Sequence, residues 1–474
     1  MIDDLDKTKV TSSARASEDT VAAISTPPGP GAVGLVRISG PAAVEVGQRI
    51  FTPLSGARPD MQANRRAVIG HVHPPGDSGS PIDQAVWLFF AGPRSYTGED
   101  IVEITVHGGP LIMAELLGAA TAAGARLAEA GEFTRRAFLN GRLDLSQAEA
   151  VASLIFAGTS KARRVMLGQV EGAMGREAGV VRRALLDAKV LLETAIDFSE
   201  DVHGDMAGEE LGGLEVLLER AVQITSRLLA TSRQGIALKE GLKVVIVGAP
   251  NVGKSSLLNA LIEEERAIVH EVAGTTRDFI EGRISIEGVP MVVVDTAGIR
   301  EGAASVEEEG IRRTQRLMER ADLLLVVLDG SRQPLDDELE LLETTAGMVR
   351  VVVANKCDLP SSGNGPLPAG VVHASALTGH GVGKVKEAIY GACVGGDPAL
   401  EETGGVVTSL RQADALTKIR DGCRQSLEGL GAGHGPELLA VGVDEALLGV
   451  GELSGEIATD EVLNMIFERF CIGK

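Results

Sequence analysis

Apolar residues in the first 140 positions form short runs that are separated by turn-rich segments. Runs of this kind, bounded by glycine and proline, are typical of strands. Four strands are predicted, over residues 21–24, 32–38, 85–90 and 101–106, and two helices, over residues 42–50 and 111–123. Three polar segments are predicted to be loops, over residues 94–100, 107–109 and 131–136. The pattern indicates an α+β domain over residues 1–140.

From residue 146 onward the apolar positions change to helical spacing. Ser146 and Glu149 form a predicted capping box at the start of this region. Apolar residues then recur every three or four positions over residues 148–155, 181–195 and 214–228, and helices are predicted again over residues 408–430, 437–448 and 460–470. Amphipathic helices need partners, so we assign residues 141–240 and 398–474 to one helical domain. Two separate helical domains are the alternative.

Between the two helical stretches, residues 241–397 carry a different pattern. The buried strand predicted over residues 244–247 runs into Gly248 to Ser255, which matches G-x-x-x-x-G-K-S, and an apolar helix follows. Strand, glycine loop and helix in this order indicate a P-loop. Gly248 and Gly253 allow backbone N–H groups to turn onto phosphate oxygens, and the helix N-terminus adds partial positive charge. Lys254 is predicted to reach the β- and γ-phosphates, and Ser255 to bind Mg²⁺.

Further motifs follow the P-loop in the order of a GTPase. A predicted strand over residues 291–294 ends in Asp295-Thr-Ala-Gly298, where Asp295 can hold Mg²⁺ and the Gly298 N–H can sense the γ-phosphate. The next motif is Asn355-Lys-Cys-Asp358, and the Asp358 carboxylate can accept both donors of guanine in a bidentate pair. Ser375 and Ala376 fit the loop behind the base. The sequence therefore predicts an α/β P-loop G domain inserted in the helical domain.

One position departs from the Ras-type arrangement. Ile299 follows the Asp-Thr-Ala-Gly motif, where Ras-like enzymes place the glutamine that orients the attacking water. Isoleucine cannot orient water. Residues 307–309 are three glutamates that can supply a replacement, or they form a solvated helix start. The residues by themselves leave both possibilities open.

Composition and charge narrow the function classes. The chain of 474 residues has a net charge of −21, which argues against a large basic nucleic-acid face. Aromatic residues make up 3%, too few for extensive base stacking. No apolar run approaches the ~20 residues of a membrane span, and residues 1–20 have no targeting pattern, so we expect a cytoplasmic protein with a short disordered tail. The four cysteines lie far apart, so reduced thiols and no structural zinc are expected.

The assembled pattern resembles the MnmE (TrmE) family of tRNA modification GTPases over nearly all of the chain from Asp19 onward. Besides the G motifs, the resemblance rests on residues 23–29, 34–40, 96–100, 131–134, 137–140, 143–145, 274–278 and the closing pentapeptide 470–474. It implies that the N-terminal α+β domain binds a tetrahydrofolate, as the 5-formyl or 5,10-methylene form, and forms a homodimer. The implied folate contacts are Arg37, Glu103, Arg142 and Lys474. Arginine at position 142, where the family often has lysine, keeps the charge but not the geometry.

The resemblance also completes the nucleotide site. It implies GTP contacts at Asn251, Val252, Gly253, Lys254, Ser255, Ser256, His270, Glu271, Val272, Ala273, Gly274, Thr275, Thr276, Asp295, Thr296, Ala297, Gly298, Asn355, Lys356, Asp358, Ser375 and Ala376. Mg²⁺ would be bound by Ser255 and Thr276. K⁺, which would stimulate hydrolysis by joining two G domains, would be held by Asn251, His270, Val272 and Thr275. Glu307 matches the water-orienting glutamate, so the expected catalytic residues are Glu307, Lys254 and Asp295.

The implied partner is the FAD-containing MnmG protein. Together the two proteins would add an aminomethyl or carboxymethylaminomethyl group to C5 of the wobble uridine of certain tRNAs. Cys471 is either a covalent catalyst or a buried small residue near the folate. Pairs of arginines at 135–136, 163–164 and 182–183 are candidates for local tRNA contacts, although such pairs are usually solvated.

Two other classes of GTPase would have features that this sequence lacks. A ribosome-assembly switch GTPase would carry an appended basic RNA-binding domain such as a KH fold, whereas this C-terminus reads as helical. A membrane-remodelling GTPase would need a basic amphipathic surface, which the sequence does not show.

Overall fold

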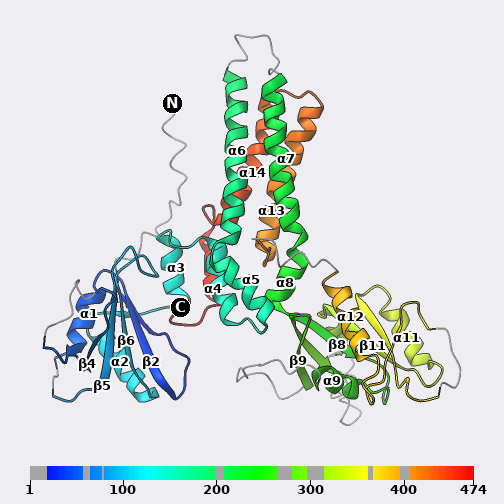
Figure 1. Ribbon diagram of the computed structural model, residues 1–474, viewed down its shortest axis with the longest axis horizontal. Coiled ribbons are helices and arrows are strands. Elements are labelled where there is room, and N and C mark those ends of the chain that lie inside the picture. Colours follow the sequence, from blue (N-terminus) through cyan, green and yellow to red (C-terminus); the bar gives the residue numbers. More distant parts are fainter. Residues whose placement is uncertain are drawn as a thin grey trace. The chain divides into compact units, whose positions relative to one another are not determined.

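The structure is a computed structural model of residues 1–474 that describes residues 19–56, 64–76, 79–197, 208–263, 280–295, 314–360, 367–395 and 405–474. These residues fall into two compact units (Figure 1). The first contains residues 1–152, 169–222 and 418–474, and the second contains residues 153–168 and 223–417. Each unit is therefore built from segments that are distant in the sequence.

The first unit begins with a seven-stranded sheet in the order β3-β4-β5-β6-β2-β1-β7. Its strands are β1 (Val21–Ile24), β2 (Gly31–Ser39), β3 (Phe51–Pro53), β4 (Val68–Val72), β5 (Asp83–Phe90), β6 (Ile101–Gly108) and β7 (Arg126–Leu127). All neighbours are antiparallel except β1 and β7. The four predicted strands are confirmed. The sequence pattern missed β3, β4 and β7, which are short and lack an unbroken apolar run.

Helices α1 (Ala43–Ile50) and α2 (Pro110–Ala122) pack against this sheet. Alternate side chains of the strands are buried in one core with these helices, including Val36, Trp87 and Ile104. Arg37 and Glu103 take the intervening positions and lie directly opposite each other on β2 and β6. The alternation thus builds the core on one face and leaves charged groups on the other.

Two of the three predicted loops are partly regular structure. Residues 131–136, expected as a loop, belong to α3 (Glu132–Leu139), which begins after Gly131 in the left-handed conformation. His107 and Gly108 continue β6 instead of leaving it. The loop prediction for residues 131–136 was wrong because it took their charges as a sign of exposure. Arg136 and Glu132 are instead buried within α3.

The helices of the first unit confirm that the chain returns to its helical domain. The long helix α6 (Ala173–Asp197) packs against α14 (Pro436–Ser454). Lys189 of α6 forms an ion pair with Asp444 of α14 at 2.7 Å, and Arg182 pairs with Glu456 just beyond α14. Elements from both sides of the G domain therefore share one packing unit, and the alternative of two separate helical domains is wrong. This unit also contains α15 (Asp460–Phe467) and most of α4 (Leu145–Ile155), α7 (Gly208–Ala230) and α13 (Leu410–Gly431).

The capping box of α4 lies two residues earlier than expected. Asp144 accepts a hydrogen bond from the Gln147 N–H at 2.8 Å, and the Gln147 side chain accepts one from the Asp144 N–H at 3.0 Å. This reciprocal pair satisfies two donors at the start of the helix. Ser146 is already inside α4, where its hydroxyl points to the carbonyl of Leu453 at 3.4 Å. The prediction of a Ser146–Glu149 box is therefore wrong.

The second unit contains a six-stranded sheet in the order β13-β12-β11-β8-β10-β9. Its strands are β8 (Leu242–Val247), β9 (Ile280–Ile286), β10 (Val289–Asp295), β11 (Leu323–Asp329), β12 (Arg350–Asn355) and β13 (Val372–His373). Only the β9–β10 pair is antiparallel. The helices of this unit are α5 (Ser160–Val170), α8 (Ser232–Glu240), α9 (Lys254–Glu263), α11 (Asp336–Thr344) and α12 (Val382–Cys393). The sheet with α9, α11 and α12 is the expected α/β G domain, whereas α5 and α8 belong to segments that were assigned to the helical domain.

Parallel pairing brings the functional ends of the central strands together. Strand residues such as Val245, Val293 and Leu325 are buried, as fits strands covered on both faces. Strands β8, β10, β11 and β12 are parallel, so their carboxyl ends share one edge of the sheet. Ligands of open α/β sheets bind at this edge. No helix in the described part of the chain is long and apolar enough to cross a membrane.

Candidate functional site

The loop between β8 and α9 has the backbone of a phosphate cradle. Gly248 and Gly253 have φ angles of 158° and 95°, and Asn251 adopts the left-handed region at 62°. A Cβ on Gly253 would lie 2.3 Å from the Asn355 side-chain nitrogen, so only glycine fits. The loop ends at the N-terminus of α9, where the helix dipole favours negative charge.

Lys254 stabilises the conformation of this loop through hydrogen bonds to its backbone. Its Nζ donates to the carbonyl oxygens of Gly248 and Ala249, at 3.0 and 2.9 Å. The residue is 8% exposed, so the cation is largely removed from bulk water. A buried ammonium inside a loop of inward-facing N–H groups is suited to bind phosphate oxygens.

The first two groups expected at Mg²⁺ lie together. The Ser255 hydroxyl donates to Oδ2 of Asp295 at 2.6 Å, and Asp295 is fully buried at the end of β10. One hydroxyl and one carboxylate beside a phosphate cradle are ligands that suit Mg²⁺, a hard cation that prefers oxygen. These residues therefore fit the ion, with Ser255 as a direct ligand and Asp295 beside it.

The guanine motif is tied to the P-loop through Asn355. Its side-chain nitrogen donates to the Val252 carbonyl at 2.9 Å, and its side-chain oxygen accepts from the Ala376 N–H at 2.9 Å. A single residue thus joins the phosphate loop to the loop expected behind the base. The Ser375 hydroxyl accepts from the Thr378 N–H at 3.2 Å, which closes that second loop.

Lys356 and Asp358 complete the base end of the site. Lys356 has a left-handed backbone with φ of 65°, and its Nζ forms an ion pair with Asp329 at 2.7 Å. Burial opposes ionisation of Asp329, but hydrogen bonds from Lys356 and Ser331 outweigh it and hold the Asp329 pKa below its ordinary value. The Asp358 side chain is exposed, so its carboxylate is accessible to a base.

Part of the predicted nucleotide and cation site lies outside the described residues. The residues concerned are His270, Glu271, Val272, Ala273, Gly274, Thr275, Thr276, Thr296, Ala297, Gly298 and Glu307. The structure thus brings together the P-loop, Asp295 and the guanine motif, while the predicted K⁺ site is represented by Asn251 alone.

A second cluster lies on the face of the N-terminal sheet opposite the core that contains α1 and α2. Arg37 forms an ion pair with Glu103 at 2.8 Å, and its guanidinium lies 5.6 Å from the ring centres of both Tyr96 and Phe133. Burial and the nearby Arg37 cation lower the pKa of the Lys474 ammonium, while Glu103 partly opposes this shift. Two cations and one carboxylate therefore meet beside aromatic rings.

The C-terminus reaches this cluster through backbone contacts. A main-chain oxygen of Lys474 accepts from the Phe133 N–H at 3.1 Å, and the carbonyl of Gly473 accepts from the Ser25 hydroxyl at 3.0 Å. Ile472 forms an antiparallel bridge with Ala130. The last residues of the chain are thus part of the N-terminal domain, which explains how Lys474 comes to lie near residues more than 300 positions earlier in the sequence.

Arg142 and Cys471, which were also expected near the folate, are both exposed. Arg142 is exposed, and its Nε donates to the Ser95 carbonyl at 3.1 Å, next to Tyr96. It therefore lies against the same loop that carries Tyr96. Cys471 is exposed, so its interpretation as a buried small residue is wrong.

A network of ion pairs that the sequence did not reveal contacts the loop that carries Tyr96 and Glu99. Arg136 is 3% exposed and pairs with Asp19, Glu99 and Glu132 at 2.7, 3.1 and 2.9 Å. Glu99 also accepts from the Ser39 hydroxyl at 2.8 Å. Arg136 is therefore a structural group, and it is removed from the candidate tRNA contacts.

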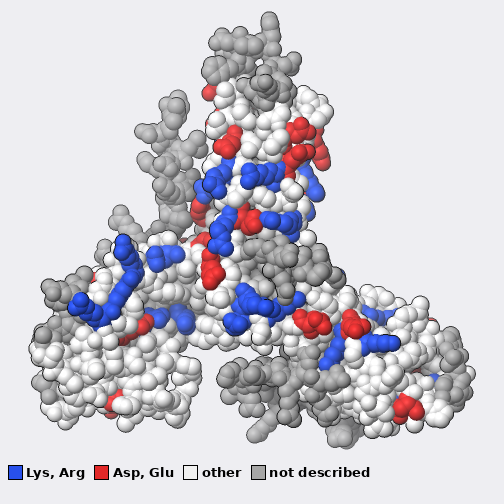
Figure 2. All heavy atoms as spheres, viewed as in Figure 1, with Lys and Arg blue, Asp and Glu red and all other residues white. Residues whose placement is uncertain are grey.

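Of the other arginine pairs, Arg182 is engaged with Glu456, whereas Arg163 and Arg164 are exposed. Figure 2 shows acidic and basic side chains intermixed on the visible face of the helices. That face therefore has no uniform basic surface, in keeping with the net charge of −21.

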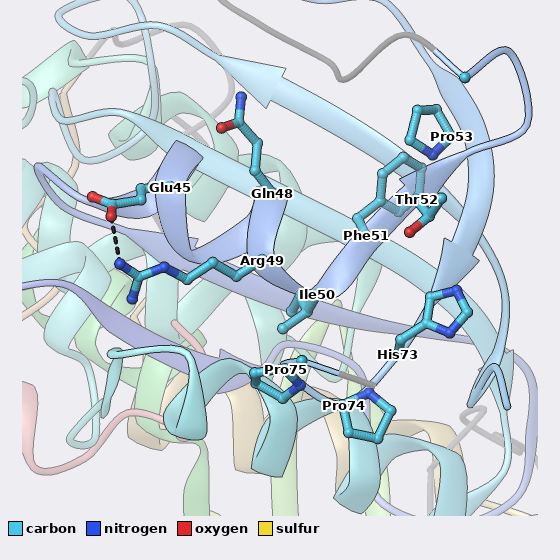
Figure 3. A pocket seen from close by; sticks show the side chains of 12 residues that line it. Glu45, Gln48, Arg49, Ile50, Phe51, Thr52, Pro53, His73, Pro74 and Pro75 are labelled. Atoms are coloured by element: carbon cyan, nitrogen blue, oxygen red, sulfur yellow. Dashed lines mark hydrogen bonds and ion pairs between the residues drawn. The ribbon is translucent and has the colours of Figure 1, made fainter. Parts of the chain in front are cut away.

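A cavity of about 600 Å³ lies beside α1 and β3 (Figure 3). Its one guanidinium, Arg49, is engaged with the Ala123 carbonyl at 2.8 Å and with Glu45 at 2.5 Å. The His73 Nδ1 atom is buried without a hydrogen-bond partner among the described residues. A single such atom does not define a ligand, and we assign none to this cavity.

Comparison with known proteins decides between the GTPase classes. The family model described as "GTP-binding protein TrmE N-terminus" matches residues 20–142, and the one described as "MnmE helical domain" matches residues 145–471. The chain belongs to the MnmE family of tRNA modification GTPases. The predicted α+β N-terminal domain and inserted G domain agree with the MnmE architecture.

Full-length relatives support the same assignment. A protein of Roseiflexus castenholzii named tRNA modification GTPase MnmE is 41% identical over 96% of this chain and 99% of its own length. Proteins of the same name from Geobacter sulfurreducens and Chloroflexus aurantiacus are 42% and 43% identical, again over 96% of this chain and over 99% and 100% of their lengths. The similarity therefore extends over the whole MnmE architecture.

Proposed function

We propose that this protein hydrolyses GTP at the P-loop site to support modification of the wobble uridine, at position 34, of certain tRNAs. The observation that carries the proposal is the joined geometry of Lys254, Ser255, Asp295 and Asn355 in a chain with the full MnmE architecture. Family membership supplies the connection to tRNA, and the site supplies the nucleotide chemistry. The protein would act in the cytoplasm, where its tRNA substrates are.

The residues divide the work of hydrolysis. Lys254 and the loop N–H groups neutralise charge on the phosphates, and Asp358 selects guanine. Ser255 and Asp295, with Thr276, would hold Mg²⁺, which supplies further charge neutralisation when bound. Glu307 is our candidate for orienting the attacking water, since Ile299 cannot do so. In a Glu307→Ala variant, turnover should fall while GTP affinity stays unchanged; a matched loss of affinity would show a structural role instead.

We assign Asn251 to the site of the K⁺ ion that stimulates GTP hydrolysis. Its left-handed backbone lies on the rim of the P-loop and its side chain is exposed. With His270, Val272 and Thr275 it would form a K⁺ site that is completed when two G domains meet, so that K⁺ supplies positive charge to the phosphates. GTP turnover should then rise when K⁺ replaces Na⁺, and equal rates in both salts would remove K⁺ from the account.

The N-terminal cluster fits an anionic folate. Arg37 and the Lys474 ammonium lie beside Glu103, and the desolvated Lys474 ammonium favours a ligand carboxylate. Tyr96 and Phe133 offer rings beside the cations. We therefore assign 5-formyl- or 5,10-methylene-tetrahydrofolate to Arg37, Glu103, Arg142 and Lys474, in a domain that also forms the homodimer. The folate would supply the one-carbon unit.

The partner in the reaction would be an FAD-containing protein of the MnmG type. An aminomethyl or carboxymethylaminomethyl group would be added at C5 of the uridine. The alternative of a ribosome-assembly switch finds no support, because residues 405–474 form α13, α14, α15 and a tail that folds onto the N-terminal domain.

Mass spectrometry of tRNA nucleosides tests the proposal. A strain that lacks the protein should lose the modified wobble uridine and regain it with the wild-type chain. Complementation by Lys254→Ala should fail through loss of GTP hydrolysis, and by Arg37→Ala through loss of folate binding. Unchanged wobble uridines in the deletion strain would refute the proposed function.

A further inference from the structure

The hairpin formed by β9 and β10 links the nucleotide site to the helices of the same unit. Ile286 pairs with Val289, so the turn consists of Glu287 and Gly288 alone. Their φ angles are 50° and 79°, as in the two-residue turns that match strand twist. A tight turn on a paired ladder makes the hairpin one stiff element.

The turn rests on the first residues of α5. The hydroxyl of Thr159 donates to the Gly288 carbonyl at 2.5 Å and accepts from the Ala162 N–H at 3.1 Å, so it also caps the helix. A Cβ on Gly288 would lie 2.8 Å from the Lys161 Cβ, so only glycine permits this approach. The contact is therefore both polar and close-packed.

Apolar packing fixes the hairpin around that contact. Ala162 of α5 is fully buried in one core with Ile286 and Val289 of the hairpin and with Leu238 of α8. At the end of α8, a Cβ on Gly241 would meet the Pro290 carbonyl at 3.2 Å. The closed end of the hairpin is thus held by two helices.

The open end of the hairpin lies at the nucleotide site. β10 ends at Asp295, whose carboxylate accepts from Ser255 of the P-loop. β9 begins at Ile280, four positions after Thr276, the second predicted Mg²⁺ ligand. Seven strand residues span roughly 20 Å, so the two ends of this element serve distant surfaces.

We propose that the β9–β10 hairpin transmits the nucleotide state of the P-loop to α5, and that the Thr159–Gly288 hydrogen bond is its joint. The proposal rests on the proposed function, because it assumes that the site binds GTP and GDP. Thr159 acts as a positioning residue: it holds the far end of the strand that carries Asp295. If GTP and GDP favour different positions of Asp295, the exchange of one nucleotide for the other also shifts α5.

Variants of Thr159 separate the joint from simple helix capping. Thr159→Asp keeps an acceptor for the Ala162 N–H, but an ionised carboxylate has no hydrogen to give to the Gly288 carbonyl. Thr159→Ser keeps both functions. Thr459→Asp is the matched control, because Thr459 caps α15 in the other unit by accepting from the Val462 N–H.

Hydrogen–deuterium exchange on the full chain, with mass spectrometry, provides the test. The two states compared are GDP and GDP with aluminium fluoride, both with Mg²⁺ and K⁺. Amides of α5, residues 160–170, should exchange at rates that differ by about threefold or more between the states in the wild type, Thr159→Ser and Thr459→Asp. The difference should vanish in Thr159→Asp, with GDP affinity unchanged.

If the α5 exchange rates of Thr159→Asp still differed between the two nucleotide states, the proposed role of the Thr159–Gly288 hydrogen bond would be wrong. That role would also be wrong if the wild-type α5 did not respond to nucleotide in a protein that hydrolyses GTP, and this result would leave the proposed function intact. A wild type that neither binds nor hydrolyses GTP would overturn both.

Discussion

Asn355 donates a hydrogen bond from its side chain to the Val252 carbonyl at 2.9 Å, which joins the guanine motif to the phosphate loop. The same side chain accepts from the Ala376 N–H. The two ends of the nucleotide site are therefore set by one amide, and the base and phosphate subsites cannot move independently.

Asp358 should decide which base is accepted. Asp358→Asn replaces two acceptors for the guanine donors with a group that also donates, which suits the C2 carbonyl of xanthine. GDP affinity should fall by about 100-fold or more, since charge-assisted hydrogen bonds contribute about 1.5–3 kcal/mol each, and xanthosine diphosphate should bind better. Fluorescence titration with labelled nucleotides measures both.

The control for this change is Asp336→Asn, an exposed acid at the start of α11 in the same domain. It should leave both affinities unchanged. If Asp358→Asn still bound GDP as tightly as the wild type, guanine recognition by Asp358 would be wrong.

Gly253 should tolerate no side chain. Its φ is 95° and a Cβ would lie 2.3 Å from the Asn355 nitrogen, so Gly253→Ala must displace the bond to Val252. We expect a loss of about 1–3 kcal/mol in stability and a marked loss of nucleotide affinity. Thermal unfolding and nucleotide titration measure the two effects.

Gly391→Ala is the matched control. Gly391 lies within α12 with open space where a Cβ would be placed. The helix should gain about 0.5–1 kcal/mol from alanine, with unchanged nucleotide affinity. Equal destabilisation by both substitutions would contradict the role of the Gly253–Asn355 approach.

Ser255 should set the dependence on Mg²⁺. Ser255→Ala removes the hydroxyl that lies 2.6 Å from Asp295, so one expected metal ligand is lost. The Mg²⁺ concentration for half-maximal GTP turnover should rise at least ~10-fold, the scale of a lost ligand or ligand-orienting contact. Ser255→Thr keeps the hydroxyl and should restore the wild-type titration; an unchanged titration in Ser255→Ala would remove Ser255 from the metal site.

Lys474 should lose its proton at lower pH than an ordinary lysine. Its pKa is lowered by burial and by Arg37, and raised by Glu103. Arg37→Ala should therefore move the pKa up, and Glu103→Ala should move it down. Acylation of Lys474 as a function of pH, quantified by mass spectrometry against exposed Lys384, measures these shifts.

The lowered pKa also fixes the sign of the pH effect on stability. Between the folded pKa and the ordinary value of 10.5, the unfolded chain binds more protons at Lys474 than the folded chain does. The contribution of Lys474 to stability therefore increases as pH rises through that window. A Lys474 pKa at or above the ordinary value of 10.5 would contradict its placement beside Arg37.

The nucleotide site was predictable because its chemistry is local in the sequence. The strand end, the loop and the helix start lie in one continuous segment around Gly248 to Ser255, and the structure confirms that arrangement. The Asn355 bond to Val252 was not predictable, because it joins residues 103 positions apart.

The N-terminal domain shows where sequence patterns fail. Residues 131–136 are rich in charge and were predicted as a loop, yet Glu132 and Arg136 are buried in α3. Their partners include Asp19 and Glu99, which no local pattern could identify. Polarity indicates exposure only when a charge lacks a partner inside the fold.

The proximity of Arg37, Glu103 and Lys474 came from family resemblance, not from spacing. Arg37 and Glu103 meet because β2 and β6 pair in register, and Lys474 joins them because the chain end folds back along Ala130. Neither the register of β2 and β6 nor the contact of the chain end with Ala130 can be inferred from neighbouring residues in the sequence.

GTP turnover by the intact chain tests the central claim most directly. Phosphate release should be measured in Mg²⁺ and K⁺ with GTP or ATP, for the wild type and for Lys254→Ala. The account predicts turnover of GTP but not of ATP by the wild type. It also predicts loss of GTP turnover in Lys254→Ala, which lacks the ammonium that binds the phosphates. Absence of GTP turnover in the wild type, or equal turnover in Lys254→Ala, would contradict it.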